Sequence, residues 1–159
     1  MARDETPTVV IGDGDELRNI DVVRSLCRSW ASGDPEQVVA HFTDDMWFRG
    51  RAELLGVEAI KGKQTFLDLL RGPQSVLKTF AMTSEADDTF ARGSLVVCSH
   101  YQTFTSKEDP REVRDDWYLG CYFFRGGKIQ EWNDYPLIPY HQARREHPPG
   151  FGRFLRAEP

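Results

Sequence analysis

Residues 119–135 read LGCYFFRGGKIQEWNDY, and this stretch decides the fold. Two runs rich in aromatic residues flank Gly126-Gly127, and paired glycines between such runs predict a tight β-hairpin. The second run ends in Trp132-Asn133-Asp134-Tyr135, where one carboxylate stands beside aromatic residues. We therefore expect the last strand of a sheet here, closing a buried and largely apolar pocket.

Outward from this hairpin, the sequence from residue 76 onward has the patterning of long strands. Asp87-Asp88 is expected to mark the first turn between them, and residues 106–111, which include Pro110, the second. We place the strands near residues 76–85, 91–104, 113–124 and 128–135.

The preceding part of the chain has the periodicity of helices. Gly33 fits a C-terminal cap, and Asp34-Pro35 fits the start of the next helix, with Asp as N-cap and Pro in the first turn. A short strand is expected over residues 46–50. The helices themselves are expected near residues 15–32, 35–42 and 57–70.

Helices followed by a meander of antiparallel strands make an α+β pattern. A curved, cone-shaped antiparallel sheet that wraps three N-terminal helices would enclose a pocket between them. We expect a flexible lead-in over residues 1–14, a single domain over 15–137, and a C-terminal tail or flap over 138–159.

Composition excludes several classes of protein. The chain has 20 Lys and Arg against 25 Asp and Glu, and this net charge of −5 argues against general nucleic-acid binding. No secretory signal and no apolar run long enough to span a membrane is visible, so a cytoplasmic protein is expected. The three cysteines lack paired spacing and the four histidines lack ligand spacing, which predicts reduced thiols and no metal.

Three stretches of the chain carry a family resemblance. They resemble sequence motifs of the nuclear-transport-factor-2-like superfamily and cover residues 38–46, residues 56–60 and, most specifically, residues 119–135. The hairpin is similar to the closing hairpin of its limonene-epoxide-hydrolase and SnoaL-like polyketide-cyclase branches. The resemblance spans about residues 17–137. It implies the cone-shaped fold, whereas the superfamily hosts isomerases, dehydratases, cyclases, hydrolases, lyases and proteins without catalytic activity.

Asp134 is the main catalytic candidate. The resemblance implies that the Asp of this hairpin helps to activate a water in the epoxide-hydrolase branch. A carboxylate in an apolar cavity loses hydration and can act as an acid or a base near neutral pH. The alternative interpretation is an Asp at a strand end that accepts a hydrogen bond from a backbone N–H.

The rest of the epoxide-hydrolase set is not matched. That branch has an Arg-x-Asp pair on the neighbouring long strand, where an ungapped count places Tyr101-Gln102-Thr103 in this sequence. The missing Arg and second Asp argue against simple epoxide hydrolysis, because one carboxylate cannot both deprotonate a water and protonate the epoxide oxygen.

Other residues are expected to replace the missing pair. Asp116 and Tyr118 share one strand face by period two, and Asp116 is expected to lie near Tyr101. If the opposite face points inward, Asp115 and Trp117 take their places. The polar wall predicted for the pocket consists of Tyr101, Thr103, Asp116, Tyr118 and Asp134, with Tyr101 and Asp116 as catalytic partners of Asp134.

Aromatic residues on the cavity wall would favour an aromatic ligand. Trp30, Trp47 and Trp132 are the candidates, and Arg49 could bind a phenolate or carboxylate at the pocket mouth or form a solvated basic edge. His100 is expected on the opposite sheet face, which is a common dimer surface in this fold. The expected partners are a small hydrophobic substrate and a second copy of the chain.

The leading hypothesis is an enzyme without a cofactor that uses acid–base chemistry on a small hydrophobic, aromatic molecule. Elimination, isomerisation and aldol-type C–C cleavage need one base, a donor for the developing oxyanion and a dry pocket. The second hypothesis is an epoxide hydrolase that uses Asp134 with Asp116, or a polyketide-cyclase-like enzyme. The third is a ligand-binding or dimerisation module without catalytic activity.

Overall fold

A computed structural model of the chain describes residues 10–49 and 59–139. The helices are α1 (Gly14–Ser29), the 3-10 helix η1 (Trp30–Ser32), α2 (Pro35–Val39), α3 (Lys63–Arg71) and α4 (Val76–Thr79). The strands are β1 (Val10–Ile11), β2 (Phe42–Phe48), β3 (Ile60–Lys61), β4 (Phe80–Arg92), β5 (Leu95–Ser106), β6 (Val113–Arg125) and β7 (Lys128–Pro139).

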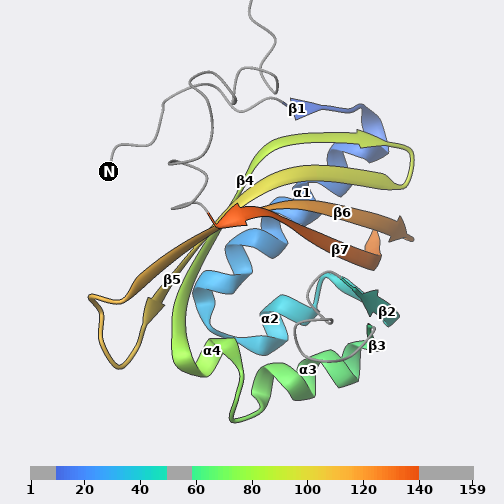
Figure 1. Cartoon of the computed structure of the whole chain (residues 1–159). Helices are drawn as coiled ribbons and strands as arrows, with labels where there is room; N and C mark the ends of the chain where they lie inside the picture. Colours follow the sequence, from blue (N-terminus) through green and yellow to red (C-terminus); the bar gives the residue numbers. More distant parts are fainter. Residues whose placement is uncertain (1–9, 50–58, 140–159) are drawn as a thin grey trace, which may run out of the picture.

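One curved sheet contains the strands in the order β1-β4-β5-β6-β7-β2-β3 (Figure 1). Strands β4 to β7 pair antiparallel in sequence order, as the strand pattern predicts. The sheet as a whole is mixed, because β1 pairs parallel with β4 and β2 pairs parallel with β7. The expectation of an α+β cone is confirmed, with a mixed sheet in place of the purely antiparallel one.

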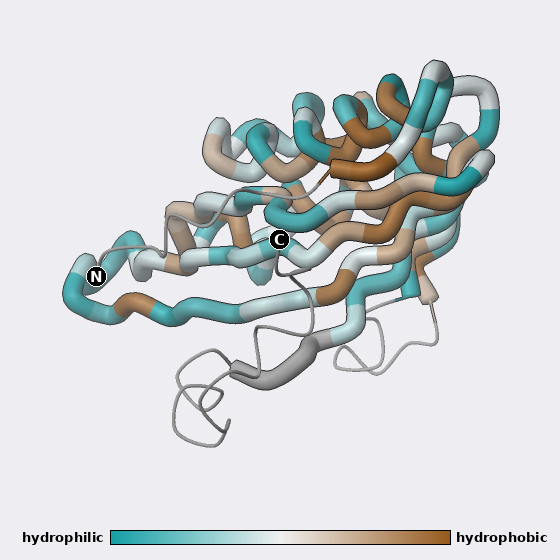
Figure 2. The backbone as a smooth tube through the Cα atoms, turned by 90° about the horizontal axis from the view of Figure 1, so that it is seen from above, coloured by the Kyte–Doolittle hydropathy of each residue, from teal (hydrophilic) through white to brown (hydrophobic). Residues whose placement is uncertain are grey.

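The helices form a layer on one face of this sheet, as the view turned by 90° shows (Figure 2). An aromatic cluster around Trp132 of β7 lies between the two layers. The centroid of the Trp132 ring is 4.4 to 6.3 Å from those of five other rings, all at least nine-tenths buried. They belong to Trp30, Phe42, Phe48, Phe66 and Tyr122.

Three of the local signals for turns and caps are confirmed. Gly33 has a left-handed φ of 67° at the end of η1. The Asp34 carboxylate accepts the Glu36 N–H at 3.0 Å at the start of α2. Gly126 and Gly127 have φ values of 59° and 73°, and two consecutive positive values are what a tight hairpin turn requires.

Two boundaries in the first long strand were predicted wrongly. Residues 76–79 form α4, because the Ser75 hydroxyl accepts the Leu77 N–H at 3.1 Å and caps a helical turn before β4 begins. Asp87-Asp88 lies inside β4, where the register shifts between Ala86 and Thr89. The strand absorbs the acidic pair as an irregularity, and the turn follows at Gly93 with a φ of 59°.

Smaller differences concern the ends of other elements. The second helix ends at Val39, and Phe42 already belongs to β2. Ile60, expected in the third helix, lies in β3 opposite Phe48. Val10–Ile11, expected in the lead-in, pairs with β4 as β1. Residues 57 and 58 of the predicted helix and residues 140–159 of the predicted tail lie outside the described residues. No helix within the described ranges is long and apolar enough to cross a membrane.

Candidate functional site

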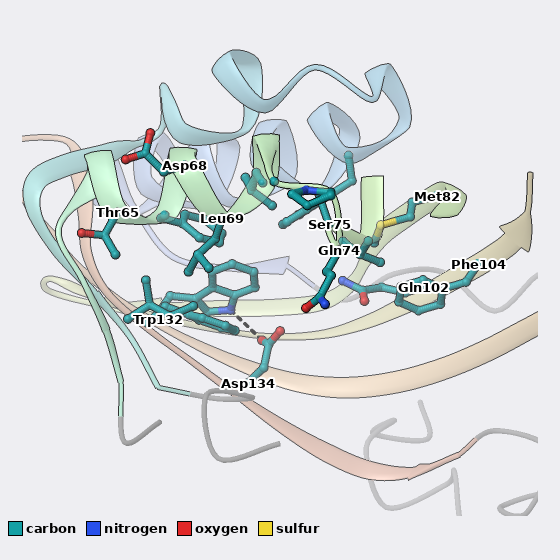
Figure 3. A pocket seen from close by; sticks show the side chains of 18 of the residues that line it. Thr65, Asp68, Leu69, Gln74, Ser75, Met82, Gln102, Phe104, Trp132 and Asp134 are labelled. Carbon is teal, nitrogen blue, oxygen red and sulfur yellow. Dashed lines mark hydrogen bonds between the residues drawn. The ribbon is translucent and has the colours of Figure 1, made fainter. Parts of the chain in front are cut away.

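A cavity of about 750 Å³ lies between the inner face of the sheet and the segment from α3 to α4 (Figure 3). Its walls are mostly apolar, with aromatic rings from Trp30, Phe48, Phe66, Phe104 and Trp132. The polar side chains on the sheet wall come from Gln102, Arg114 and Asp134. A predominantly apolar cavity with a few polar groups has the character of a small-molecule site.

Asp134 points from β7 into this cavity (Figure 3). Its side chain is only 3% exposed, and its Oδ1 accepts hydrogen bonds from Trp132 Nε1 at 2.6 Å and from His100 Nε2 at 3.0 Å. Among the described residues both bonds end on Oδ1, so Oδ2 is the oxygen available to a bound molecule. The carboxylate is therefore fixed on one side and open on the other.

His100 lies on β5, on the same strand face as Gln102, and it is not among the described residues that line the cavity. Its side chain is 1% exposed, and its ring centroid lies 5.3 Å from that of Tyr118, the residue opposite it on β6. Burial lowers the pKa of His100, but the charge of Asp134 and the hydrogen bond to it outweigh this effect, so the pKa lies above its ordinary value of 6.5. The pair thus favours an imidazolium beside a carboxylate.

This pair predicts a pH-dependent stability. Because the folded-state pKa of His100 is raised, its contribution is fully present below the unfolded value of 6.5 and is lost as the pH rises through the folded value. We expect the free energy of unfolding, measured with urea from pH 5.5 to 9, to decrease over that window. The decrease should be absent in His100→Gln and retained in His41→Gln; parallel curves for wild type and His100→Gln would refute the assignment.

Two carboxamides approach the same part of the cavity. Figure 3 shows the side chains of Gln102 on β5 and Gln74 in the α3–α4 connection pointing towards the region of Asp134. Gln102 is 5% exposed, and its Nε2 lies 3.5 Å from His100 Nδ1. The cavity therefore places the Asp134 carboxylate near amide groups that can donate hydrogen bonds.

Asp116 and Tyr118 lie on the inner face of the sheet. This is the first of the two orientations predicted for their strand, the other having Asp115 and Trp117 inside. The Tyr118 hydroxyl donates to Asp116 Oδ2 at 2.8 Å, and the Arg114 guanidinium approaches the same oxygen at 3.0 Å. Neither Asp116 nor Tyr118 is among the described residues that line the cavity. They lie on this face without lining the cavity, and Arg114 is the member of this group that reaches it.

The placement predicted for Tyr101 and Thr103 is wrong. Tyr101 lies opposite Trp117, and Thr103 lies opposite Asp115, to which its hydroxyl donates at 2.8 Å. Asp116 instead faces Gln102. Since side chains alternate between the two faces of a strand, this shift of one residue puts Tyr101 and Thr103 on the outer face.

The same shift turns His100 inward, against the prediction that it faces a dimer surface. His100 and Gln102 were both missed as site residues. The alternation that places them inside runs Val96, Cys98, His100, Gln102 and Phe104, all buried. Val97 on the other face is also buried. Because both faces of this strand carry apolar residues, the hydrophobic pattern of the sequence does not show which face points inward. The homodimer stays a prediction.

Of the remaining candidates, Trp30 and Trp132 line the cavity, whereas Trp47 and Arg49 do not. Trp47 lies opposite Glu131 of β7, and the Arg49 guanidinium sits 4.9 Å from the centroid of the Trp47 ring. Arg49 Nε is 3.7 Å from the Glu131 carboxylate. These residues form an ion-paired cluster away from the cavity. Within the described ranges, no three His, Cys, Asp or Glu side chains are grouped as metal ligands.

Comparison with solved structures gives the same architecture. An LEH-like epoxide hydrolase of M. tuberculosis matches with a TM-score of 0.63 and 19% identity, over 79% of this chain and 82% of that one. A Catenulispora acidiphila protein with a ketosteroid-isomerase-like fold, in complex with trimethylamine, matches with a TM-score of 0.60 and 14% identity, over 72% and 84%. TerC co-crystallised with polyporic acid matches with a TM-score of 0.62 and 15% identity, over 79% and 96%.

At these identities the likeness concerns the fold, and no curated protein matches the sequence. A family model described as the SnoaL-like domain matches residues 23–132, which is more than half of the chain. That range runs from within α1 to Trp132 of β7, and it includes the other helices and His100. The chain therefore belongs to the SnoaL-like domain family of the nuclear-transport-factor-2-like superfamily.

Proposed function

We propose that this protein is an acid–base enzyme, independent of any cofactor, that moves a proton at a carbon atom of a small hydrophobic, aromatic molecule. The observation that carries the proposal is the buried Asp134, whose Oδ1 is held by Trp132 and His100 while Oδ2 faces the cavity. A carboxylate fixed in this way is oriented before the substrate arrives, which is what general base catalysis requires.

The proposed step begins when Asp134 Oδ2 takes a proton from the carbon next to a carbonyl group. The electron pair of that C–H bond moves into the carbonyl, and an enolate oxygen forms. The carboxamides of Gln102 and Gln74 can donate hydrogen bonds to this oxygen in a mostly apolar cavity. His100 and Trp132 keep their hydrogen bonds to Oδ1 throughout, so the carboxylate does not rotate.

The fate of the enolate defines the reaction class. Return of the proton to another carbon is an isomerisation, and loss of a leaving group from the adjacent carbon is an elimination. If Asp134 takes a hydroxyl proton instead, cleavage of the neighbouring C–C bond yields the same kind of enolate. All three fates use one base and one oxyanion site, so we propose a lyase, dehydratase or isomerase.

The spacing of the carboxylates favours this chemistry over epoxide hydrolysis. Asp134 lies opposite Gly120, and Asp116 is on the same strand as Gly120 but four residues earlier, which is about 13 Å along a strand. The Asp116 carboxylate is also bonded by Tyr118 and Arg114. These two carboxylates are therefore poorly placed to act on one water and one epoxide ring together.

The wall of the cavity supports an aromatic substrate. Trp30, Phe48, Phe66, Phe104 and Trp132 all contribute rings to it. Flat apolar ligands gain buried area and offset ring contacts against such walls. The volume of about 750 Å³ lies within the range of roughly 300–1,000 Å³ that is typical of small-molecule sites.

The proposal is tested with an aromatic ketone in deuterated water. We expect the protein to accelerate incorporation of deuterium next to the carbonyl of 2-tetralone above the buffer rate, as followed by NMR. In parallel, styrene oxide is incubated in oxygen-18 water. Formation of labelled diol without deuterium exchange would make the protein a hydrolase and overturn the proposal. Absence of both activities across a panel of aromatic ketones and epoxides would favour a binding module.

A further inference from the structure

Arg114 places a cation on a cavity wall whose other described side chains are apolar, neutral polar or acidic. Among the described residues that line the cavity, it is the only Lys or Arg. It lies on β6 opposite Phe104, whereas Asp134 pairs with Gly120 on the same strand, six residues further along. Arg114 and Asp134 therefore belong to opposite ends of the sheet wall.

The Arg114 side chain is held in place from two sides. Its guanidinium carbon lies 4.7 Å from the centroid of the Phe104 ring, and its NH2 group lies 3.0 Å from Asp116 Oδ2. The Tyr118 hydroxyl donates to the same Asp116 oxygen at 2.8 Å, which limits rotation of that carboxylate. Asp116 and Tyr118 are 7% and 1% exposed, so the support is buried while half of the Arg114 side chain, 51%, stays accessible.

This arrangement leaves hydrogen-bond donors for a ligand. A guanidinium has five N–H groups in one plane, and the ion pair with Asp116 occupies one terminal nitrogen. An Arg that is already stacked and paired loses little conformational entropy on binding a second acceptor. Asp116 offsets its charge, so the Arg114 side chain discriminates by directed N–H groups as well as by charge.

We propose that Arg114 binds a carboxylate on the substrate, at the end remote from the reacting carbon. The inference rests on the proposed function and names its substrate class: a flat, apolar molecule with a carboxylate at one end and an acidic C–H near the other. Six residues of strand separate the two positions by about 20 Å along the backbone. The side chains of Arg114 and Asp134 reduce the distance between their charged groups. The distance that is left suits a skeleton of two or three fused rings.

The test compares two ligands that differ only in the charged group. 2-Naphthoic acid and 2-naphthamide have the same ring system, and their affinities are measured by isothermal titration calorimetry at pH 7.5. We expect wild type to bind the acid about tenfold more tightly than the amide, as for a charge-assisted Arg–carboxylate contact. In Arg114→Met the acid should lose that tenfold, whereas the affinity for the amide stays the same and shows that the cavity is intact.

Two further variants establish whether the preference comes from the Arg114 guanidinium itself. Arg125→Met removes an arginine from the same strand that is also half exposed and paired to an aspartate, Asp45, and it should keep the preference for the acid. The double variant Arg114→Met/Asp116→Asn also removes the negative charge of Asp116, which in Arg114→Met no longer faces its arginine, and it should still lack the preference. A preference that returns in the double variant would assign the effect to repulsion by Asp116 and overturn the inference.

The remaining outcomes are also decisive. Equal affinity of wild type for acid and amide, or an unchanged preference in Arg114→Met, overturns the inference. Deuterium exchange is measured separately from binding. A wild-type protein that exchanges deuterium but shows no carboxylate preference therefore overturns only the role of Arg114. A wild-type protein that shows the preference but no exchange overturns only the proposed reaction.

Discussion

Replacement of Asp134 by Asn is expected to reduce enzyme-dependent deuterium exchange by about 10²- to 10⁴-fold, the usual contribution of a general base. The amide has nearly the same shape as the carboxylate, and its oxygen can still accept the Trp132 Nε1–H that now bonds Asp134 Oδ1. It cannot take a proton from carbon. The loss should therefore appear in kcat, with little change in the affinity for 2-naphthamide.

Asp68→Asn is the matched control for this experiment. Asp68 also contributes a carboxylate to the cavity wall, but it lies on α3 and is exposed, and Gln64 donates to it at 2.8 Å. We expect this variant to exchange deuterium at the wild-type rate. If Asp134→Asn keeps the wild-type rate and pH profile, another group is the base and the proposed mechanism is wrong.

Replacement of Trp132 by Ala should cause the largest loss of stability. Trp132 is 3% exposed and packs at the centre of the aromatic cluster between the helices and the sheet. Truncation of a buried aromatic residue to Ala lowers the free energy of unfolding by about 3–5 kcal/mol. It also removes the Nε1–H that bonds Asp134, so the same variant should lose exchange activity.

Trp132→Phe separates packing from the hydrogen bond. This variant keeps an aromatic ring in the cluster and removes the donor to a buried carboxylate, which should lower the free energy of unfolding by about 1–3 kcal/mol. Trp47→Ala is the control, because Trp47 is only partly buried and its ring contacts the cations of Arg49 and Lys61 outside the cavity. Trp47→Ala should lower the free energy of unfolding, measured by urea titration for all three variants, by about 1 kcal/mol. Equal losses for Trp132→Ala and Trp47→Ala would contradict the central position of Trp132.

The local elements of this fold could be predicted because neighbouring residues alone determine them. Gly126-Gly127 adopts two positive φ values that other residues rarely tolerate, and Gly33 and Asp34-Pro35 end one helix and begin the next. The irregularity at Asp87-Asp88 could not be predicted in this way. An acidic pair is compatible with a turn or with a strand irregularity, and pairing with β5 decides between them.

In the candidate site, too, contacts between residues close in the sequence could be predicted, and contacts between distant residues could not. Asp134 and Trp132 are two residues apart on one strand, so the sequence by itself places them on one face, and the hairpin identifies that strand. The contact between Asp134 and His100 joins residues 34 apart in the chain, and it depends on how β5 and β7 both pair with β6.

Only the tertiary structure decided which face of β5 lines the cavity. Both faces of this strand carry buried apolar and polar side chains, so its sequence is compatible with either orientation. Pairing of Gln102 with Asp116 brings His100 and Gln102 inside and leaves Tyr101 and Thr103 outside. A strand repeats every two residues, and a shift of one residue exchanges its whole set of inward side chains. The sequence by itself therefore determined the fold and nominated Asp134, whereas strand register decided which side chains surround that carboxylate.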